Sequence, residues 1–277
     1  QMIKDLVLPD QIHNFAHNNE WLIRNLMNVG RVSEASSLAM NMLELPRHPR
    51  YNTLSKGGSS AKYGRRRLFE VLYRYELWGQ LVELSRTRYL PPTELEGEQV
   101  KRLRHLGVAY VRRQDTENGI SVLIDLRDRL DEIERQSGRA AQRAKDAERK
   151  KIEGERSGKK EGEGKEGKES AELSDAEKKR IQEAGKKAAN SYRSRLGSLK
   201  KALAEIEGHL AVREGDLAAA FGKFREAGGV NELYLAGIEL ELALEEKAGT
   251  KEENKGKLRS REKILEWARG HVNGRKG

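Results

Sequence analysis

Apolar residues recur at helical spacing along most of the chain, and the strict alternation typical of half-buried strands is almost absent. One apolar stripe comprises Trp21, Leu22, Leu26 and Val29. After Gly30-Arg31, a second stripe comprises Val32, Ala35, Leu38, Ala39, Met42 and Leu43 and ends at Pro46. Two amphipathic helices joined by so short a turn must pack antiparallel, each covering the apolar face of the other. The pattern therefore predicts an all-α chain made of helix pairs.

The same helix–turn–helix pattern recurs further along the chain. Its turns are predicted at Gly30, Glu76, Gln114 and Gly215. The pair around Gly215 is the clearest, with key positions at Gly208, Ala211, Gly215-Asp216, Ala220, Phe224 and Ala227. Another pair is predicted to begin at residues 234–237 and to include Ile264, Leu265 and Trp267. Repetition of one unit favours a stack of similar units over a globule with a single core.

These units resemble the tetratricopeptide repeat (TPR). In that family a glycine closes the turn, a small residue lets the two helices approach, and a proline ends the unit. Gly215, Ala220 and Phe224 match the family's turn glycine, small contact residue and second-helix aromatic. The aromatic residue that the family has at the position of Ala211 is missing. The resemblance covers roughly two thirds of the chain and implies a TPR-like α-solenoid that binds proteins and performs no chemistry.

An insert interrupts the repeats. Successive turns are 46, 38 and 101 residues apart, against a repeat period of ~34 residues. Around the long interval, apolar residues alternate three and four apart at Leu123, Leu126, Leu130 and Ile133, and again at Leu196, Leu199, Leu203, Ile206 and Leu210. Two such seams predict a helical hairpin of coiled-coil type. Its tip is predicted to be disordered over Gly154–Ser170, and Ser174 with Glu177 predicts a capping box where the helix restarts.

The chain is accordingly predicted to contain three regions. Residues 1–130 form TPR-like helix pairs, about three units. Residues 131–199 form the charged, protruding helical hairpin with a disordered tip near 154–170. Residues 200–277 form further TPR-like helix pairs.

The charge of the chain is high but mixed in sign. Hydrophobic residues make up 36% and charged residues 35%, and the formal net charge is +10. Residues 1–130 contribute +5, residues 131–201 contribute +6 and residues 202–277 contribute −1. Because this excess is spread over a mixed background rather than gathered on one face, the sequence disfavours nucleic acid as the partner.

No catalytic, cofactor or metal site is predicted. The chain has no cysteine, which excludes a thiol nucleophile and cysteine-ligated metals. Residues 162–168 satisfy GxGxxG and GxxxxGK, but no strand precedes them, and Glu169 stands where a nucleotide-binding loop needs Ser or Thr. His13 and His17 have the minimum spacing for metal ligation on a helix, without the carboxylate of an HExxH motif. We expect no enzyme, no cofactor and no small-molecule substrate.

The sequence also bears on location. No apolar run approaches the ~20 residues that span a bilayer, so we expect a soluble protein with no membrane partner. Both ends look like cuts from a longer chain. The absence of a signal peptide therefore leaves the compartment undetermined.

Two surface features are candidate partner sites. The first is the cationic loop that starts at Arg47 and ends with Tyr63, Arg65, Arg66 and Arg67. Arginines beside aromatic rings suit phosphate, carboxylate or base recognition, although a solvated loop is the plainer interpretation. The second is the inner surface formed by the first helix of each pair, with Arg24, Asn25, Asn28 and Arg104. Amide and guanidinium groups can bind a peptide backbone or carboxylate, and ordinary solvation explains them equally well.

Three functions follow from these observations, in order of preference. The first is a non-catalytic protein–protein interaction scaffold, part of a larger protein, that binds a segment of a protein or peptide partner along the solenoid groove. The second is an accessory repeat region of a larger bacterial enzyme, for which residues 45–78 resemble repeat regions in proteins that carry a thioredoxin-like domain. The third is a basic solenoid that binds nucleic acid.

Overall fold

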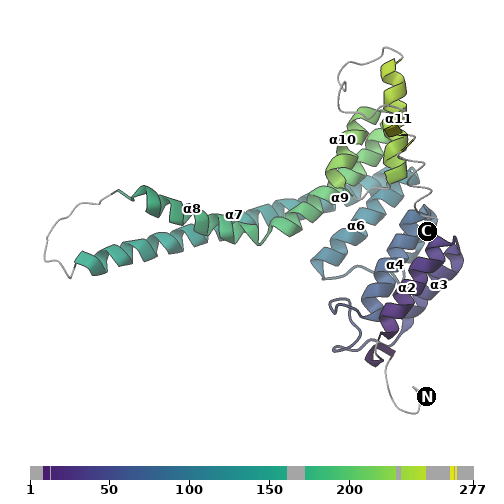
Figure 1. The fold of residues 1–277 in the computed structure, drawn as a ribbon, viewed down its shortest axis with the longest axis horizontal. Coiled ribbons are helices and arrows are strands. Elements are labelled where there is room, and N and C mark those ends of the chain that lie inside the picture. Colours follow the sequence, from purple (N-terminus) through teal and green to yellow (C-terminus); the bar gives the residue numbers. More distant parts are fainter. Residues whose placement is uncertain are drawn as a thin grey trace. The chain divides into compact units, whose positions relative to one another are not determined.

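A computed structural model describes residues 9–12, 14–160, 172–228, 232–247, 263–264 and 266. Throughout these residues the regular elements are helices, as the sequence predicts. The chain divides into two compact units, which are described separately (Figure 1). The first unit comprises residues 1–124 and 201–277, and the second comprises residues 125–200.

The helices lie in the following order along the chain (Figure 1). The elements up to the long helix are η1 (Pro9–Gln11), α2 (Phe15–Asn28), α3 (Val32–Glu44), α4 (Ser60–Arg74), α5 (Trp78–Leu84) and α6 (Glu96–Arg112). The remaining elements are α7 (Thr116–Lys160), α8 (Asp175–Asn190), α9 (Arg193–Glu214), α10 (Leu217–Ala227) and α11 (Glu232–Lys247).

Four helix pairs are joined by a turn of the same geometry. The turn residues are Gly30, Glu76, Gln114 and Gly215, with φ of 78°, 54°, 64° and 82°. In each turn the turn residue's amide donates to the carbonyl three residues back at 3.0–3.1 Å, and the next amide donates five residues back at 2.8–2.9 Å. This pattern is a Schellman-type helix end. The next helix begins two residues after each turn residue. The turn positions predicted from the sequence are thus confirmed.

Glycines allow close approaches in the first unit, and two of these approaches involve α9. A Cβ added to Gly208 would lie 2.6 Å from Cε1 of Phe224, which is fully buried on α10. A Cβ added to Gly107 on α6 would clash with Ile206 on α9. At both positions the absence of a side chain lets two helices pack more closely than any other residue would permit.

The buried side-chain amide of Asn52 fixes the long loop between α3 and α4. Asn52 accepts a hydrogen bond from the Ala61 amide at 2.8 Å and donates one to the Pro46 carbonyl at 2.9 Å. Ser59 then caps α4, because its hydroxyl accepts from the Lys62 amide at 3.2 Å. The cationic loop is therefore held at both of its ends.

The second unit contains most of α7, all of α8 and the start of α9. Ile152 and Leu199 are buried in it. Arg180 pairs with Glu148 at 2.8 Å, and Arg156 donates to Glu177 at 2.9 Å. The capping box of Ser174 and Glu177 is confirmed, because both of its hydrogen bonds are formed.

The structure differs from the sequence at the predicted tip of the hairpin. Residues 154–160 belong to α7 and are helical, whereas they were predicted to be disordered. Lysine and glutamate have high helix propensity, and Arg156 is anchored by Glu177, so Gly154 and Gly158 do not end the helix. The rest of the predicted tip, together with the two glycine-rich motifs in it, lies outside the described residues.

Candidate functional site

The helix α2 carries large apolar side chains on the side that faces away from its core. Trp21 is 54% exposed, Leu22 is 48% exposed and Val29 is 70% exposed. The buried positions of the same helix are instead Ala16, Glu20, Ile23, Leu26 and Met27. The sequence grouped Trp21, Leu22 and Val29 with Leu26 in one stripe that the next helix should cover, and for these three residues the predicted burial was wrong. At about 100° per residue, they lie on the side opposite Ile23 and Met27.

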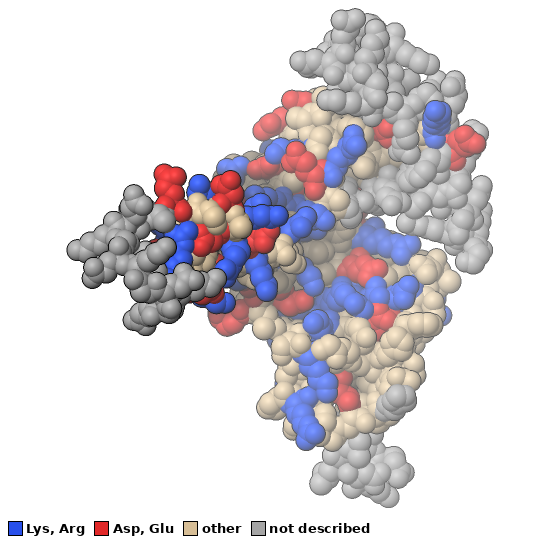
Figure 2. Space-filling model, turned by 60° about the vertical axis from the view of Figure 1, so that its left-hand side comes forward, with Lys and Arg blue, Asp and Glu red and all other residues tan. Residues whose placement is uncertain are grey.

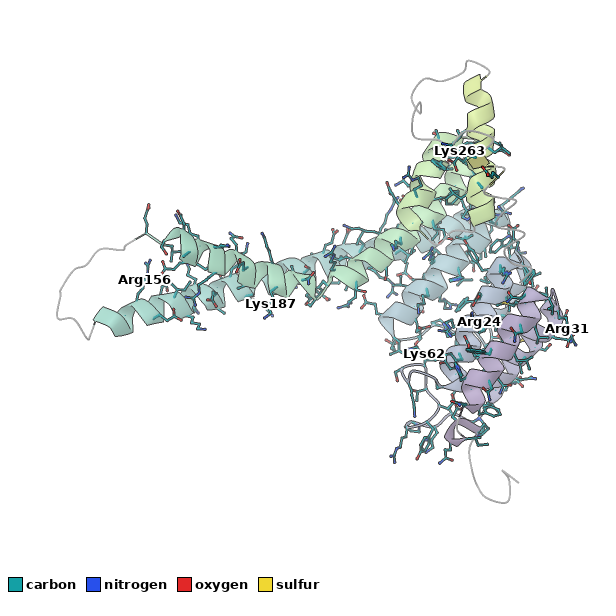
Figure 3. The ribbon with its side chains drawn as sticks, in the orientation of Figure 1. Arg24, Arg31, Lys62, Arg156, Lys187 and Lys263 are labelled. Carbon is teal, nitrogen blue, oxygen red and sulfur yellow. The ribbon has the colours of Figure 1, made fainter. Side chains whose placement is uncertain are left out.

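The predicted polar residues of α2 lie beside this apolar surface. Arg24, Asn25 and Asn28 are all exposed, and Figure 3 labels Arg24 on α2. Asn25 stands one turn after Trp21 and one turn before Val29, so it shares their side of the helix. Asn28 accepts a hydrogen bond from Arg74 of α4 at 3.2 Å. We call Trp21, Leu22, Asn25 and Val29 the α2 face.

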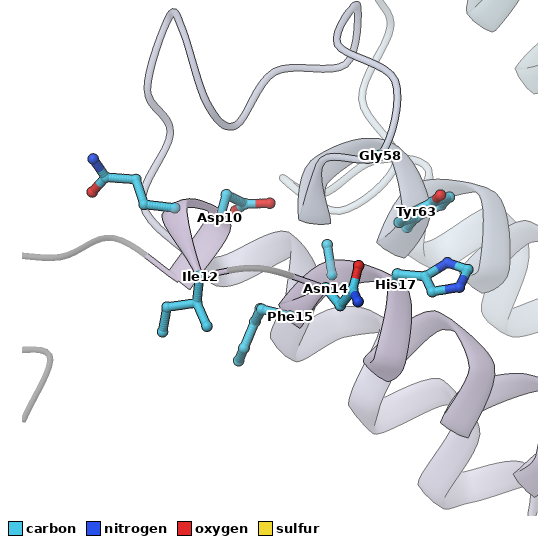
Figure 4. A pocket seen from close by; sticks show the side chains of 9 residues that line it. Asp10, Ile12, Asn14, Phe15, His17, Gly58 and Tyr63 are labelled. Carbon is cyan, nitrogen blue, oxygen red and sulfur yellow. The ribbon is translucent and has the colours of Figure 1, made fainter.

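A cleft lies at the start of the same helix (Figure 4). Its volume is about 530 Å³, and it is lined by η1, the first turn of α2, Gly58 and Tyr63. The Asp10 carboxylate is already engaged, because it accepts from the Ser60 amide at 2.7 Å. The ring of His17 lies 5.2 Å from Trp21 and 6.4 Å from Tyr63, measured between centroids. His17 therefore connects the cleft with the α2 face.

The three consecutive arginines of α4 do not form one cationic surface. Arg65 is 1% exposed, and its guanidinium donates to the Pro91 carbonyl at 2.9 Å and stacks on Phe69. Burial lowers the pKa of Arg65 to about 10. Arg67 is also buried and pairs with Glu20 and Glu70. Consecutive helical residues point in different directions, so only Arg66 remains exposed.

The buried carboxylate of Glu20 pairs with both Arg66 and Arg67. It is 3% exposed and accepts from Arg66 at 2.7 Å and from Arg67 at 2.8 Å. Burial acts to raise the pKa of Glu20, but the hydrogen bond from Arg67 and the charges of Arg67, Arg66 and Arg24 outweigh it and lower the pKa. The two arginines thus stabilise the packing of α2 on α4. Arg66 also stacks on Tyr63, with 4.9 Å between the guanidinium carbon and the ring centroid.

Arg104 is likewise engaged within the first unit. Its guanidinium pairs with the buried Glu205 and donates to the Gly228 carbonyl at 3.1 Å. The Tyr73 hydroxyl donates to the same carboxylate, and burial, followed by the charge of Glu205, raises the pKa of Tyr73. Arg104 therefore links α6 to α9, and its role as a partner-binding residue stays a prediction.

The remaining candidates are histidines, and His17 and His209 are among those that lie in the described part of the chain. His13 lies outside the described residues, so its position relative to His17 is not described. Within the described part of the chain, no group of three or more His, Cys, Asp or Glu side chains could hold a metal ion. His209 is buried, and burial followed by the charge of Arg112 lowers its pKa to about 3. Its imidazole is therefore neutral at physiological pH.

Several charged side chains of the first unit lie beside opposite charges. Figure 2 shows Lys and Arg next to Asp and Glu over much of the visible face. The pairs Arg31–Glu34, Arg88–Glu44 and Arg112–Glu76 are examples.

Among the described residues, no helix is long and apolar enough to cross a membrane. Comparisons with protein-family models, curated proteins and solved structures returned no match.

Proposed function

We propose that this protein is a non-catalytic interaction scaffold that binds an apolar segment of a partner protein on the α2 face. One observation carries the proposal: Trp21, Leu22 and Val29 are about half exposed or more on one side of α2. Exposed large apolar side chains clustered on one surface mark interaction sites, and tryptophan is the residue most enriched among energetically dominant contacts. Asn25, within this cluster, offers an amide that can donate to and accept from a peptide backbone.

The cleft at the start of α2 extends this surface. It is reached from Trp21 through His17 and has room for a side chain of the bound segment. An apolar segment whose anchor residue covers Trp21 and whose neighbour enters the cleft would use both features. Burial of apolar area supplies the affinity at about 25 cal/mol per Å², before the cost of ordering the segment is subtracted.

We further propose that the helix pairs are TPR-like units stacked as an α-solenoid. The identical turns at Gly30, Glu76, Gln114 and Gly215 support this proposal, because one repeated connection gives one repeated pair geometry. The three predicted regions, 1–130, 131–199 and 200–277, form part of the same proposal. In a solenoid the exposed side of a first helix such as α2 belongs to the binding surface.

Selection of binding peptides tests the proposed function. The full chain is presented to a random peptide display library, and the enriched peptides are sequenced. We expect them to share an apolar anchor, and we expect their binding to be lost in Trp21→Ala. The matched control is Ile124→Ala, because Ile124 is also 54% exposed but lies on α7. Failure to enrich any peptide, or enriched peptides that bind Trp21→Ala and wild type equally, would contradict the proposal.

A further inference from the structure

The excess positive charge of the chain is concentrated in one part of the helical hairpin. Residues 139–151 of α7 contain six Lys or Arg and two Asp or Glu. Residues 178–195 of α8 and α9 contain seven Lys or Arg and one Glu. Together these residues, which we call the basic band, carry thirteen positive and three negative charges. The resulting +10 equals the formal net charge of the whole chain.

The two halves of the basic band lie side by side. Arg180 pairs with Glu148 at 2.8 Å, and a Cβ added to Gly185 would lie 2.6 Å from Lys145. The adjacent parts of the second unit are slightly acidic. Residues 125–138 with 196–200 contain four basic and five acidic residues, and residues 152–160 with 172–177 contain three basic and five acidic residues. The antiparallel pairing therefore brings two positive stretches, one of net charge +4 and one of net charge +6, together in one region.

Many cations of the band are available to a partner. Arg143, Lys150, Lys179, Lys186, Lys187 and Arg193 are exposed, and no ion pair within the described residues holds any of them. Lys179 and Lys186 are seven residues apart, so they lie on one side of α8, and Arg193 is the first residue of α9. Lys187 is labelled in Figure 3. Because these positive charges are numerous and unpaired, they repel one another. Binding of a polyanion relieves this repulsion and is therefore favoured.

We propose that the basic band binds the phosphate backbone of a nucleic-acid duplex without reading its sequence. Thirteen residues of α7 span about 18 Å at 1.5 Å per residue. A duplex carries one charge per about 1.7 Å, so roughly ten phosphates lie along that length. Release of their counterions supplies the binding free energy, and no base contact is needed.

The other polyanionic partners fit less well. Among the described residues of the second unit, no large hydrophobic side chain is exposed, so neither a membrane surface nor an apolar peptide finds an anchor there. Tyr192 is the single aromatic residue in residues 125–200. Single-stranded nucleic acid is usually held by bases stacked on several aromatic side chains. The composition of the band therefore favours a duplex over a single strand.

Binding of a DNA duplex of about 20 base pairs to the full chain tests this inference by fluorescence anisotropy, over about 50 to 200 mM salt. The band variant is Lys179→Gln, Lys186→Gln and Arg193→Gln together. The control is Arg86→Gln, Arg113→Gln and Arg213→Gln, which removes three exposed charges from the first unit. Helical content measured by circular dichroism shows that both variants are folded.

We expect the band variant to lose about tenfold or more in affinity and to reduce the salt slope by about 2 to 3 log units per tenfold salt, at about 0.9 per phosphate contact. The control should change both values little. Several results would overturn the inference: no binding of wild type at low salt, equal losses in both variants, tighter binding of the single strand, or equal binding of polyglutamate.

Discussion

Phe224 packs its ring against the backbone of Gly208, where any side chain would take the space of the ring. The contact joins α9 to α10, and both residues were selected from the sequence as repeat positions. Phe224 is 1% exposed, and it also contacts the rings of His209 and Tyr234. This cluster packs α9, α10 and α11 together.

The first prediction concerns this contact. Gly208→Ala should lower the free energy of unfolding by about 1–3 kcal/mol, because the added Cβ must displace the ring of Phe224. The matched control is Gly222→Ala on α10, where a Cβ would meet no atom within 4 Å. That change should stabilise by about 0.5–1 kcal/mol, since alanine has the higher helix propensity. Urea denaturation measures the free energy of unfolding of both variants. Equal effects of the two substitutions would show that Gly208 and Phe224 do not approach each other as closely as described.

A second prediction concerns the buried carboxylate of α2. Glu20→Gln should destabilise the protein by about 3 kcal/mol, because it leaves the buried Arg67 without a full counter-charge. Glu34→Gln, which breaks the exposed pair with Arg31, should cost less than about 1 kcal/mol. The pKa of Glu20 is lowered in the folded state from its ordinary value of 4.5. Its contribution is therefore complete above pH 4.5 and is lost on acidification through the folded pKa. The difference in the free energy of unfolding between wild type and Glu20→Gln should therefore shrink as the pH falls below 4.5. A difference that does not depend on pH would contradict this account.

The third prediction uses His209, whose folded-state pKa of about 3 lies below its ordinary value of 6.5. Because the folded state disfavours the protonated imidazole, stability is complete above pH 6.5 and falls as the pH drops towards 3. Between about pH 7 and pH 5, this one group should remove about 2 kcal/mol. His209→Leu should remove that part of the pH dependence. If wild type and His209→Leu lose stability in parallel over this range, the imidazole is not buried as described.

The fourth prediction concerns the organisation of the chain. Replacing residues 132–198 with a short flexible linker should leave one cooperative thermal transition in the remainder, because the first unit has its own core. Helical content per residue should stay the same in circular dichroism. A broad, non-cooperative transition would show that the hairpin is needed for the packing of the helix pairs.

The sequence predicted the turns well because each is a local event. Gly30 and Gly215 adopt positive φ, which glycine tolerates, and Asp216 caps the following helix. Glu76 and Gln114 also adopt positive φ, although neither residue type favours it. Their positions were found by matching the surrounding residues to the repeat pattern that the other helix pairs resemble. The resemblance thus located turns that residue preference alone would have missed.

The surroundings of the candidate partner-binding residues were harder to predict because they depend on distant contacts. Arg65 is buried because its guanidinium reaches the carbonyl of Pro91, 26 residues away. Trp21 looked like a core residue, but α2 packs on α3 and α4 through Ile23 and Met27. The basic band was missed because charge was summed over residues 131–201, which include the acidic stretches beside the band, and its two halves meet only through the antiparallel register of α7 with α8. None of these facts follows from local pattern.

The central claim is that the α2 face binds an apolar peptide, and calorimetric titration of an enriched peptide tests it most directly. The peptide is titrated into wild type, Trp21→Ala and Ile124→Ala. The account predicts that Trp21→Ala loses at least about 2 kcal/mol of binding free energy, roughly 30-fold in Kd, as expected for a dominant tryptophan contact. Ile124→Ala should stay within about 0.5 kcal/mol of wild type. Equal affinities for all three proteins would contradict the claim.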